Sequence, residues 1–279
     1  MGYRWLIAVG AGLVLLLPVG AAGARTQLGS VGHETAKWGA WTADLTWVKK
    51  DAFTYTDLHL TLLNGATLVL DEPVTSKVAE VGNLGPEIYG GHHAVVFRDV
   101  DGDGTPELLL ALYTGGAHCC SIEQVFDLRT APPRKTEMSF GDAGATIKMI
   151  GGHTVFVGAD DSFDYVFTDY ADSGAPIAIW HYAPDSFVNV TSSFRSAISA
   201  DAASWWRYYQ QGLKDKRDAR GVLAAWAADE ARLGQAATAK QTLLQLAFNG
   251  ALDRGYGGWK GSTYVRQLWK FLGKAGYLG

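Results

Sequence analysis

Alternating aspartates near the middle of the chain form the stretch with the clearest capacity for chemistry. Residues 99–107 read Asp-Val-Asp-Gly-Asp-Gly-Thr-Pro-Glu. A turn that folds these carboxylates inward brings hard oxygen donors around one cation, and the intervening glycines permit the backbone that such a turn requires. Carboxylates, one backbone carbonyl and water can together supply the roughly six to eight oxygens that calcium takes. The predicted Ca²⁺ ligands are the carboxylates, and one carbonyl, of Asp99, Asp101, Asp103, Thr105 and Glu107.

An EF-hand is not the architecture that this loop predicts. The twelfth position of an EF-hand loop requires Glu, and Leu110 stands there. The flanking segments 94–97 and 107–113 are short apolar runs, which are typical of strands rather than of long helices. We therefore expect a calcium loop between two β-strands. The alternative is an Asp/Gly turn that holds no ion.

The same stretch resembles the calcium loops of FG-GAP and VCBS-type repeats, which occur in integrin-like β-propellers and bacterial surface proteins. The resemblance rests on residues 99–107 and covers only the loop and its flanking strands. It implies that Asp99, Asp101, Asp103 and Glu107 hold calcium between two strands of a blade. One clear copy of the loop is present, and no Phe-Gly…Gly-Ala-Pro pattern accompanies it.

The two cysteines are adjacent, in the run Gly-Gly-Ala-His-Cys-Cys that ends at Cys120. Neighbouring Cα atoms lie about 3.8 Å apart across a trans peptide, which is below the usual disulfide range of about 4.4 Å upward. We expect a vicinal disulfide between Cys119 and Cys120; buried thiols and a bond between chains are the alternatives. The phrase is similar to one in uncharacterised exported bacterial proteins, a resemblance that implies no activity.

Histidines offer a second kind of chemistry. His118 precedes a thiol, which suggests a Cys/His nucleophile. His92 and His93, with His118 or His153, could build a transition-metal site. Each of these histidines is more often a structural hydrogen-bonding residue. A hydrolase that uses histidine and aspartate would require the four side chains to converge in one pocket.

The N-terminal segment and the charge distribution indicate where the chain acts. Residues 1–24 read as a secretory signal peptide, with a basic start, an apolar run and a small-residue cleavage site. After it, residues 25–194 carry 10 basic and 22 acidic side chains, whereas 195–279 carry 13 and 6. The net charge of -4 offers no global attraction for nucleic acid. We expect a secreted or periplasmic protein with no integral membrane span once the signal is removed.

The spacing of apolar residues changes near residue 195, from a pattern typical of strands to one typical of helices. The segment 56–63 alternates apolar and polar residues and is followed by Asn64-Gly65, the strongest short hairpin signal. Strands are also expected at 94–97, 107–113, 122–128, 147–150, 154–157, 165–168 and 177–182. Beyond residue 195 the apolar period is helical, and four helices are expected.

These patterns predict an α+β chain: a signal peptide at 1–24, an acidic antiparallel β module at 25–194, propeller-like or a sandwich, and a basic helical module at 195–279. Its expected function is that of an exported calcium-binding β module, structural or engaged in adhesion or ligand recognition, with an extracellular protein or a glycan as partner. Binding is favoured over catalysis. The alternatives are a hydrolase that uses histidine and aspartate, and a redox switch at the cysteine pair.

Overall fold

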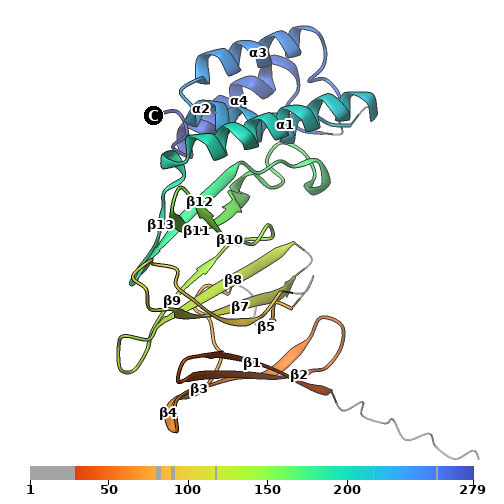
Figure 1. The fold of residues 1–279 in the computed structure, drawn as a ribbon. Helices are drawn as coiled ribbons and strands as arrows, with labels where there is room; N and C mark the ends of the chain where they lie inside the picture. Colours follow the sequence, from red (N-terminus) through yellow and green to blue (C-terminus); the bar gives the residue numbers. More distant parts are fainter. Residues whose placement is uncertain (1–28, 80–82, 89–91, 117, 216, 256) are drawn as a thin grey trace, which may run out of the picture.

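The computed structural model describes residues 29–79, 83–88, 92–116, 118–215, 217–255 and 257–279. In these residues the strands form three antiparallel sheets stacked one above another, with four helices at the far end of the stack (Figure 1). The predicted α+β class is confirmed. The sheets remain open layers packed face to face, so the propeller-like version of the prediction is wrong. The expected signal peptide at 1–24 lies outside the described residues.

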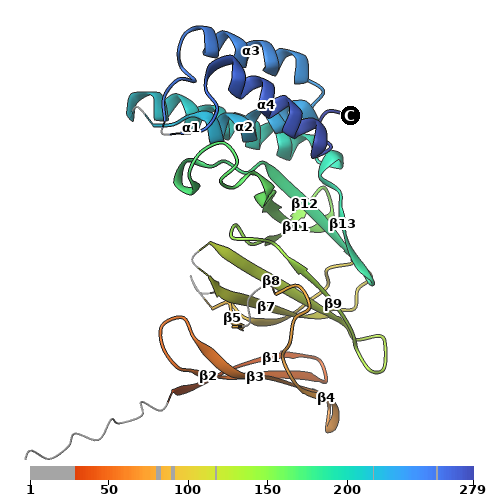
Figure 2. The ribbon, with the colours of Figure 1, turned by 180° about the vertical axis from the view of Figure 1, so that it is seen from behind.

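The first sheet is a meander of four strands at the end of the stack opposite the helices (Figure 2). Its strands are β1 (Ser30–Trp38), β2 (Trp41–Lys49), β3 (Tyr55–Asn64) and β4 (Thr67–Pro73). Leu58, Leu60 and Leu62 are buried on one face of β3, as their alternation predicts. Gly65 turns the chain into β4 with a φ of +57°, so the predicted hairpin is confirmed.

The middle sheet is built around one strand that is buried on both faces. The strands are β5 (Gly85–Pro86), β6 (Val95–Arg98), β7 (Glu107–Gly116), β8 (Cys119–Asp127) and β9 (Arg134–Ser139). Leu108, Leu110 and Leu112 of β7 pack in the core shared with the first sheet. Leu109 faces the opposite way, into the core shared with the third sheet. The nearly continuous apolar run in β7 is the pattern that burial on two sides requires.

The third sheet separates the middle sheet from the helices. Its strands are β10 (Thr146–Ile150), β11 (His153–Ala159), β12 (Ile177–Ala183) and β13 (Ser186–Asn189). The strand expected at 165–168 is wrong: this segment lies between two short 3-10 helices, and Tyr165 has a φ of +60°. Phe163 and Phe167 turn together into the helical core, and that packing replaces strand pairing.

The helices begin directly after the third sheet. They are α1 (Arg195–Asp215), α2 (Arg220–Arg232), α3 (Ala236–Phe248) and α4 (Gly261–Lys274). Gly234, at a φ of +83°, turns the chain between α2 and α3. Two aromatic residues of α1 belong to the helical core: Tyr209 is buried, and Trp206 packs on Trp226 with ring centroids 4.9 Å apart.

One carboxyl group is buried where α1, α2 and the third sheet meet. Asp229 of α2 is fully buried, and neither of its oxygens has a hydrogen-bond partner among the described residues. Nearby, Asp201 of α1 accepts hydrogen bonds from the Ile177 backbone N–H at 2.9 Å and from Trp205 Nε1 at 3.0 Å. Burial, and then the Asp201 carboxylate, raise the pKa of Asp229 to about 9. Asp229 is therefore protonated at neutral pH.

Replacing this acid with its neutral isostere tests that protonation state. The pKa of Asp229 is higher in the folded protein than its unfolded value of about 3.9. The contribution of Asp229 to the free energy of unfolding is therefore fully present below about pH 4. It is lost as pH rises toward about 9. Asp229→Asn should match the wild type in acid and exceed its free energy of unfolding near pH 8, by on the order of 1–4 kcal/mol. Urea unfolding across this pH range measures the difference.

Asp185→Asn, which alters an exposed carboxylate, is the matched control. Parallel pH profiles for Asp229→Asn and the wild type would show that Asp229 is ionised in the native protein.

Candidate metal centre

The aspartate loop joins β6 to β7 at one end of the middle sheet. These two strands pair antiparallel, with Arg98 opposite Glu107, so the loop is a β-hairpin connection as predicted. Gly102 and Gly104 have φ of +83° and +90°, in the left-handed region that glycine adopts without steric cost. The positions of the two glycines in the sequence are therefore set by the turn itself.

Three of the four predicted carboxylates converge. Asp99, Asp101 and Glu107 each offer one oxygen, and the three oxygens lie within 4.8 Å of one another. The loop backbone holds them: Asp99 accepts hydrogen bonds from the N–H groups of Gly102, at 2.7 Å, and Gly104, at 3.0 Å. Each carboxylate oxygen has two acceptor sites, so these bonds leave capacity for a cation.

Glu107 is the ligand with the least access to water. It is only 1% exposed, and its Oε2 accepts a hydrogen bond from the Val100 N–H at 3.0 Å. Burial raises the pKa of Glu107 to about 7, and the charge of Asp101 adds to the effect. Keeping this buried carboxylate ionised beside Asp101 costs free energy that a bound cation would offset.

Asp103 and Thr105, the other two predicted ligands, meet different partners. The Asp103 carboxylate accepts a hydrogen bond from the Thr105 N–H at 2.7 Å and forms an ion pair with Arg129. Asp103 thus lies outside the converging group found among the described residues. Thr105 contributes its N–H to the loop network.

Arg129, from the turn between β8 and β9, is a participant that the sequence pattern missed. Its Nη2 lies 3.0 Å from Asp101 Oδ2, and its Nε donates to Asp127 Oδ1 at 2.8 Å. These contacts lower the pKa of Asp127. The guanidinium therefore supplies positive charge beside the loop. Nothing in the spacing of residues 99–107 points to a partner that far along the chain.

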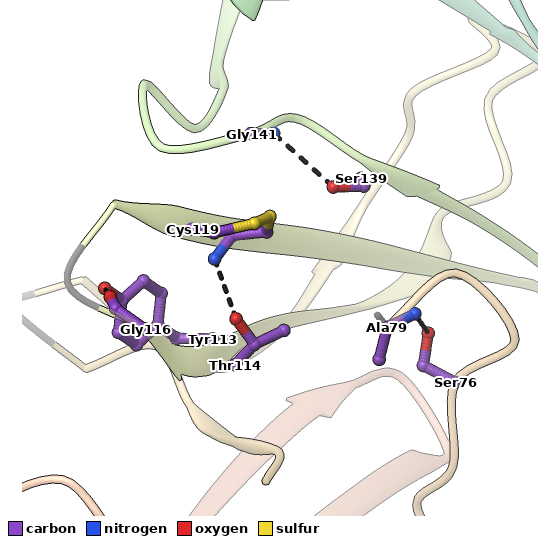
Figure 3. Close-up of a disulfide and its surroundings, with 9 residues drawn as sticks. Ser76, Ala79, Tyr113, Thr114, Gly116, Cys119, Ser139 and Gly141 are labelled. Atoms are coloured by element: carbon purple, nitrogen blue, oxygen red, sulfur yellow. Dashed lines mark hydrogen bonds between the residues drawn. A yellow bond between two sulfur atoms is a disulfide. The ribbon is translucent and has the colours of Figure 1, made fainter. Parts of the chain in front are cut away.

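The cysteine pair lies at the opposite end of β7, where β8 begins (Figure 3). Cys119 and Cys120 form a disulfide, joined by a cis peptide with Cα atoms 3.1 Å apart. The Cys120 N–H donates to Thr114 Oγ1 at 2.8 Å, which ties the pair to the end of β7. The predicted vicinal disulfide is confirmed, and the alternative of buried thiols is wrong for this structure.

The histidines do not converge. His92 and His93 line a cavity beside the middle sheet, whereas His153 lines a separate hollow on the third sheet. The ring of His118 packs on Tyr170, with centroids 3.9 Å apart. A hydrolase or a transition-metal site built from these histidines loses its geometric basis. A Cys/His nucleophile with His118 also fails, since the two sulfur atoms are bonded to each other.

Comparison with known proteins gives one relative. The chain is 32% identical over 158 residues to a protein of Synechocystis described as a "Probable thylakoid lumen protein". The aligned part is 53% of this chain and 46% of that protein, so the chain spans about half the relative's length. No family model matches the chain, and no solved structure does. Among the described residues, no helix is both long and apolar enough to cross a membrane.

The position of Arg129 predicts that it competes with a cation for the loop. Arg129→Gln should lower the melting temperature without added metal by a few degrees, because Asp101, Asp103 and Asp127 lose their shared positive partner. The same variant should show a larger rise in melting temperature on adding calcium than the wild type.

Arg134→Gln is the matched control, since Arg134 contacts Asp127 and Asp185 but neither loop aspartate. If the two variants responded equally to calcium, the loop contacts of Arg129 would have no bearing on cation binding.

Proposed function

We propose that this chain is an exported protein that binds calcium at the β6–β7 loop, and that the ion stabilises a β-structure used for recognition. The observation that carries the proposal is the convergence of Asp99, Asp101 and Glu107 within 4.8 Å. All three donors are carboxylate oxygens, the ligand type that hard cations prefer. The resemblance of residues 99–107 to FG-GAP and VCBS-type loops favours calcium among those cations.

The place of the loop in the fold supports a structural role for the ion. Glu107 is the first residue of β7, the strand buried between the first and third sheets. Val100, within the loop, is itself fully buried in the core between the middle and third sheets. A cation bound by both ends of the loop would hold the edge strand β6 against β7. Calcium sites in extracellular modules bind at about 10⁻⁴ to 10⁻³ M, so occupancy would follow the calcium concentration outside the cell.

An exported location rests on two independent observations. The sequence pattern of residues 1–24 is that of a secretory signal. The Synechocystis relative is described as a probable thylakoid lumen protein. A lumenal or periplasmic compartment agrees with both, and also with a disulfide, which persists in oxidising compartments.

Binding is favoured over catalysis because the histidines are dispersed. His92, His118 and His153 lie at three separate places, so they form no shared catalytic pocket. The recognised partner would be an extracellular protein or a glycan, contacted by surfaces that the calcium loop holds in place.

Calcium titration followed by thermal unfolding tests the site. The wild type should gain several degrees in melting temperature at millimolar calcium, since a ligand that binds only the native state stabilises it. Asp101→Asn should lose most of this shift, because it removes one charged ligand from the group. The side chain of Asp101 is only 7% exposed, so binding by a distant acidic surface would not depend on it.

Asp142→Asn serves as the control, because Asp142 belongs to a second acidic cluster with Asp161 and Asp164. A calcium shift that survives Asp101→Asn and disappears in Asp142→Asn would move the site to that cluster. No shift in the wild type would end the proposal.

Reversible reduction of the disulfide is a second candidate function, favoured by the observed bond between Cys119 and Cys120. An external dithiol would supply two electrons and two protons, becoming a disulfide while Cys119 and Cys120 become thiols. Cys119 is partly exposed, so a reductant can reach it. Ser121, directly after the pair, exchanges backbone hydrogen bonds with Gly141 and Phe140, which would transmit a change to the 140–145 loop.

Thiol labelling of native protein, before and after mild reductant, measures the bond by mass spectrometry. Hydrogen exchange of residues 140–145 should rise on reduction while that of β3 stays constant. Thiols that label without reductant, or exchange that does not change, would exclude the switch.

A further inference from the structure

A cavity of about 380 Å³ opens beside the middle sheet, and a partly buried carboxyl group belongs to its lining. It is lined by β6, β7 and β8 on one side and by residues 143–147, which lead into β10, on the other. Cavities of this size hold small organic molecules. The calcium loop lies outside it, so the cavity is a separate site from the one proposed above.

Glu123 supplies that carboxyl group. It lies on β8 directly opposite Ala111 of β7, and both residues line the cavity. The Glu123 side chain is partly buried, and burial raises its pKa to about 8. No hydrogen bond to this carboxyl group is found among the described residues. A carboxyl group without a hydrogen-bond partner in the protein can accept a hydrogen bond from a donor that enters the cavity.

Glu87 adds a second carboxylate to the same cavity. Its charge acts on Glu123, and its own carboxylate is hydrogen-bonded with Ser121. Gly144 keeps this end of the cavity open. A Cβ at Gly144, which has a φ of +62°, would lie 3.1 Å from Ser121 Oγ and 3.9 Å from Glu87 Oε1. Any side chain at this position would therefore crowd Ser121 and contact Glu87.

The exposed rim of the cavity has the opposite character. Arg98, at the end of β6, and His92 both line it and are both exposed. Arg98 remains positively charged at any physiological pH. The cavity is thus acidic in its interior and basic at its mouth, which suits a ligand with a donor-rich cationic end and an acceptor at the other.

We propose that this cavity binds a small primary amine that carries a carboxylate or similar acceptor, the chemistry of a free amino acid. An ammonium group has three N–H donors and no acceptor, so it can satisfy Glu123 and Glu87 together. A carboxylate at the other end of the ligand would meet the guanidinium of Arg98.

A bare metal ion fits the cavity less well. Within the described residues, the only acidic or imidazole group whose ligand atoms converge within 4.8 Å is that of Asp99, Asp101 and Glu107. The carboxyl groups and imidazoles of the cavity therefore do not offer three convergent ligands to one ion. An extended organic cation can span them, since its donor and acceptor ends lie several bonds apart.

Four probes with related carbon skeletons separate the contributions. They are alanine, propylamine, propionate and propanol, titrated into the full-length protein by calorimetry while the Gly144 amide is followed by NMR. Alanine and propylamine should bind and shift the Gly144 resonance, with alanine the tighter of the two. Propionate and propanol should do neither. Equal binding of propanol and propylamine would overturn the proposal, because it would show that charge plays no part.

Substitutions of the lining residues test whether the amines bind in this cavity. Glu123→Gln retains the shape of the side chain and should weaken alanine binding at least tenfold, whereas Glu72→Gln, on the exposed edge of the first sheet, should not. Arg98→Gln should remove the advantage of alanine over propylamine. Ala143→Trp changes an exposed lining residue and should block both amines without touching the core. Unchanged binding in Glu123→Gln and Ala143→Trp would refute the site.

Running each titration in saturating calcium and again after chelation keeps this inference apart from the calcium proposal. Amine binding that persists in a protein with no calcium response would uphold the cavity and reject the metal site. A calcium response without amine binding would do the reverse.

Discussion

The stack of sheets depends on burying both faces of β7. Leu108, Leu109, Leu110 and Leu112 are at most 1% exposed, and they point alternately into two cores. Burial of a leucine side chain contributes roughly 1.5–3 kcal/mol, so these four together are comparable to a typical domain stability of about 5–15 kcal/mol. A strand of this kind cannot lie at a surface. The first and third sheets are therefore required to cover the two faces of β7, and the layered architecture follows from its apolar run.

The acidic loop and the disulfide lie at the two ends of β7. Glu107 opens β7 and belongs to the acidic loop, while the disulfide of Cys119 and Cys120 follows its other end. Between them, Ala111 forms part of the cavity floor opposite Glu123. Because β7 is held by packing on both sides, groups attached to it keep their relative positions. A rigid central strand of this kind suits a protein that presents binding sites more than one that must open and close.

Some of these features were predictable because they follow from local rules. The alternation in β3, the Asn-Gly hairpin and the helical periods after residue 195 each depend on neighbours a few residues apart. The strands β1 and β9 were missed because they are largely exposed or only partly buried and rich in polar residues, so they carry little alternation. The segment around Tyr165 was mistaken for a strand because its aromatic residues pack with distant helices. No local pattern contains that partner.

The residues of the candidate sites divide in the same way, into those that the local sequence brings together and those that long-range strand pairing brings together. Asp99, Asp101 and Glu107 could be identified because a loop places residues close in sequence close in space. Arg129, Glu87 and Glu123 reach their positions only through strand pairing across the middle sheet, so a search for short motifs does not find them. The dispersal of the histidines also depends on long-range folding, since His153 lies in the third sheet whereas His92 and His118 lie in connections next to the middle sheet.

The charge asymmetry along the chain takes a different meaning in the folded protein. The ion pairs of Arg129 and Arg134 stay within the acidic part, and that of Arg220 stays within the basic part. The helices contact the third sheet through hydrogen bonds instead. Arg232 donates to the Ile177 carbonyl at 2.6 Å, and the Tyr277 hydroxyl donates to Asp160 at 2.5 Å.

Hydrogen bonds and apolar packing thus link the two parts of the chain. Much of the acidic charge of the β part therefore remains available to attract cations, from a metal ion at the loop to an amine in the cavity. Such attraction weakens with salt for exposed groups and much less for buried ones. Glu107 is buried and Glu123 is partly buried, so salt should screen a cation bound at either site less than one bound at an exposed carboxylate.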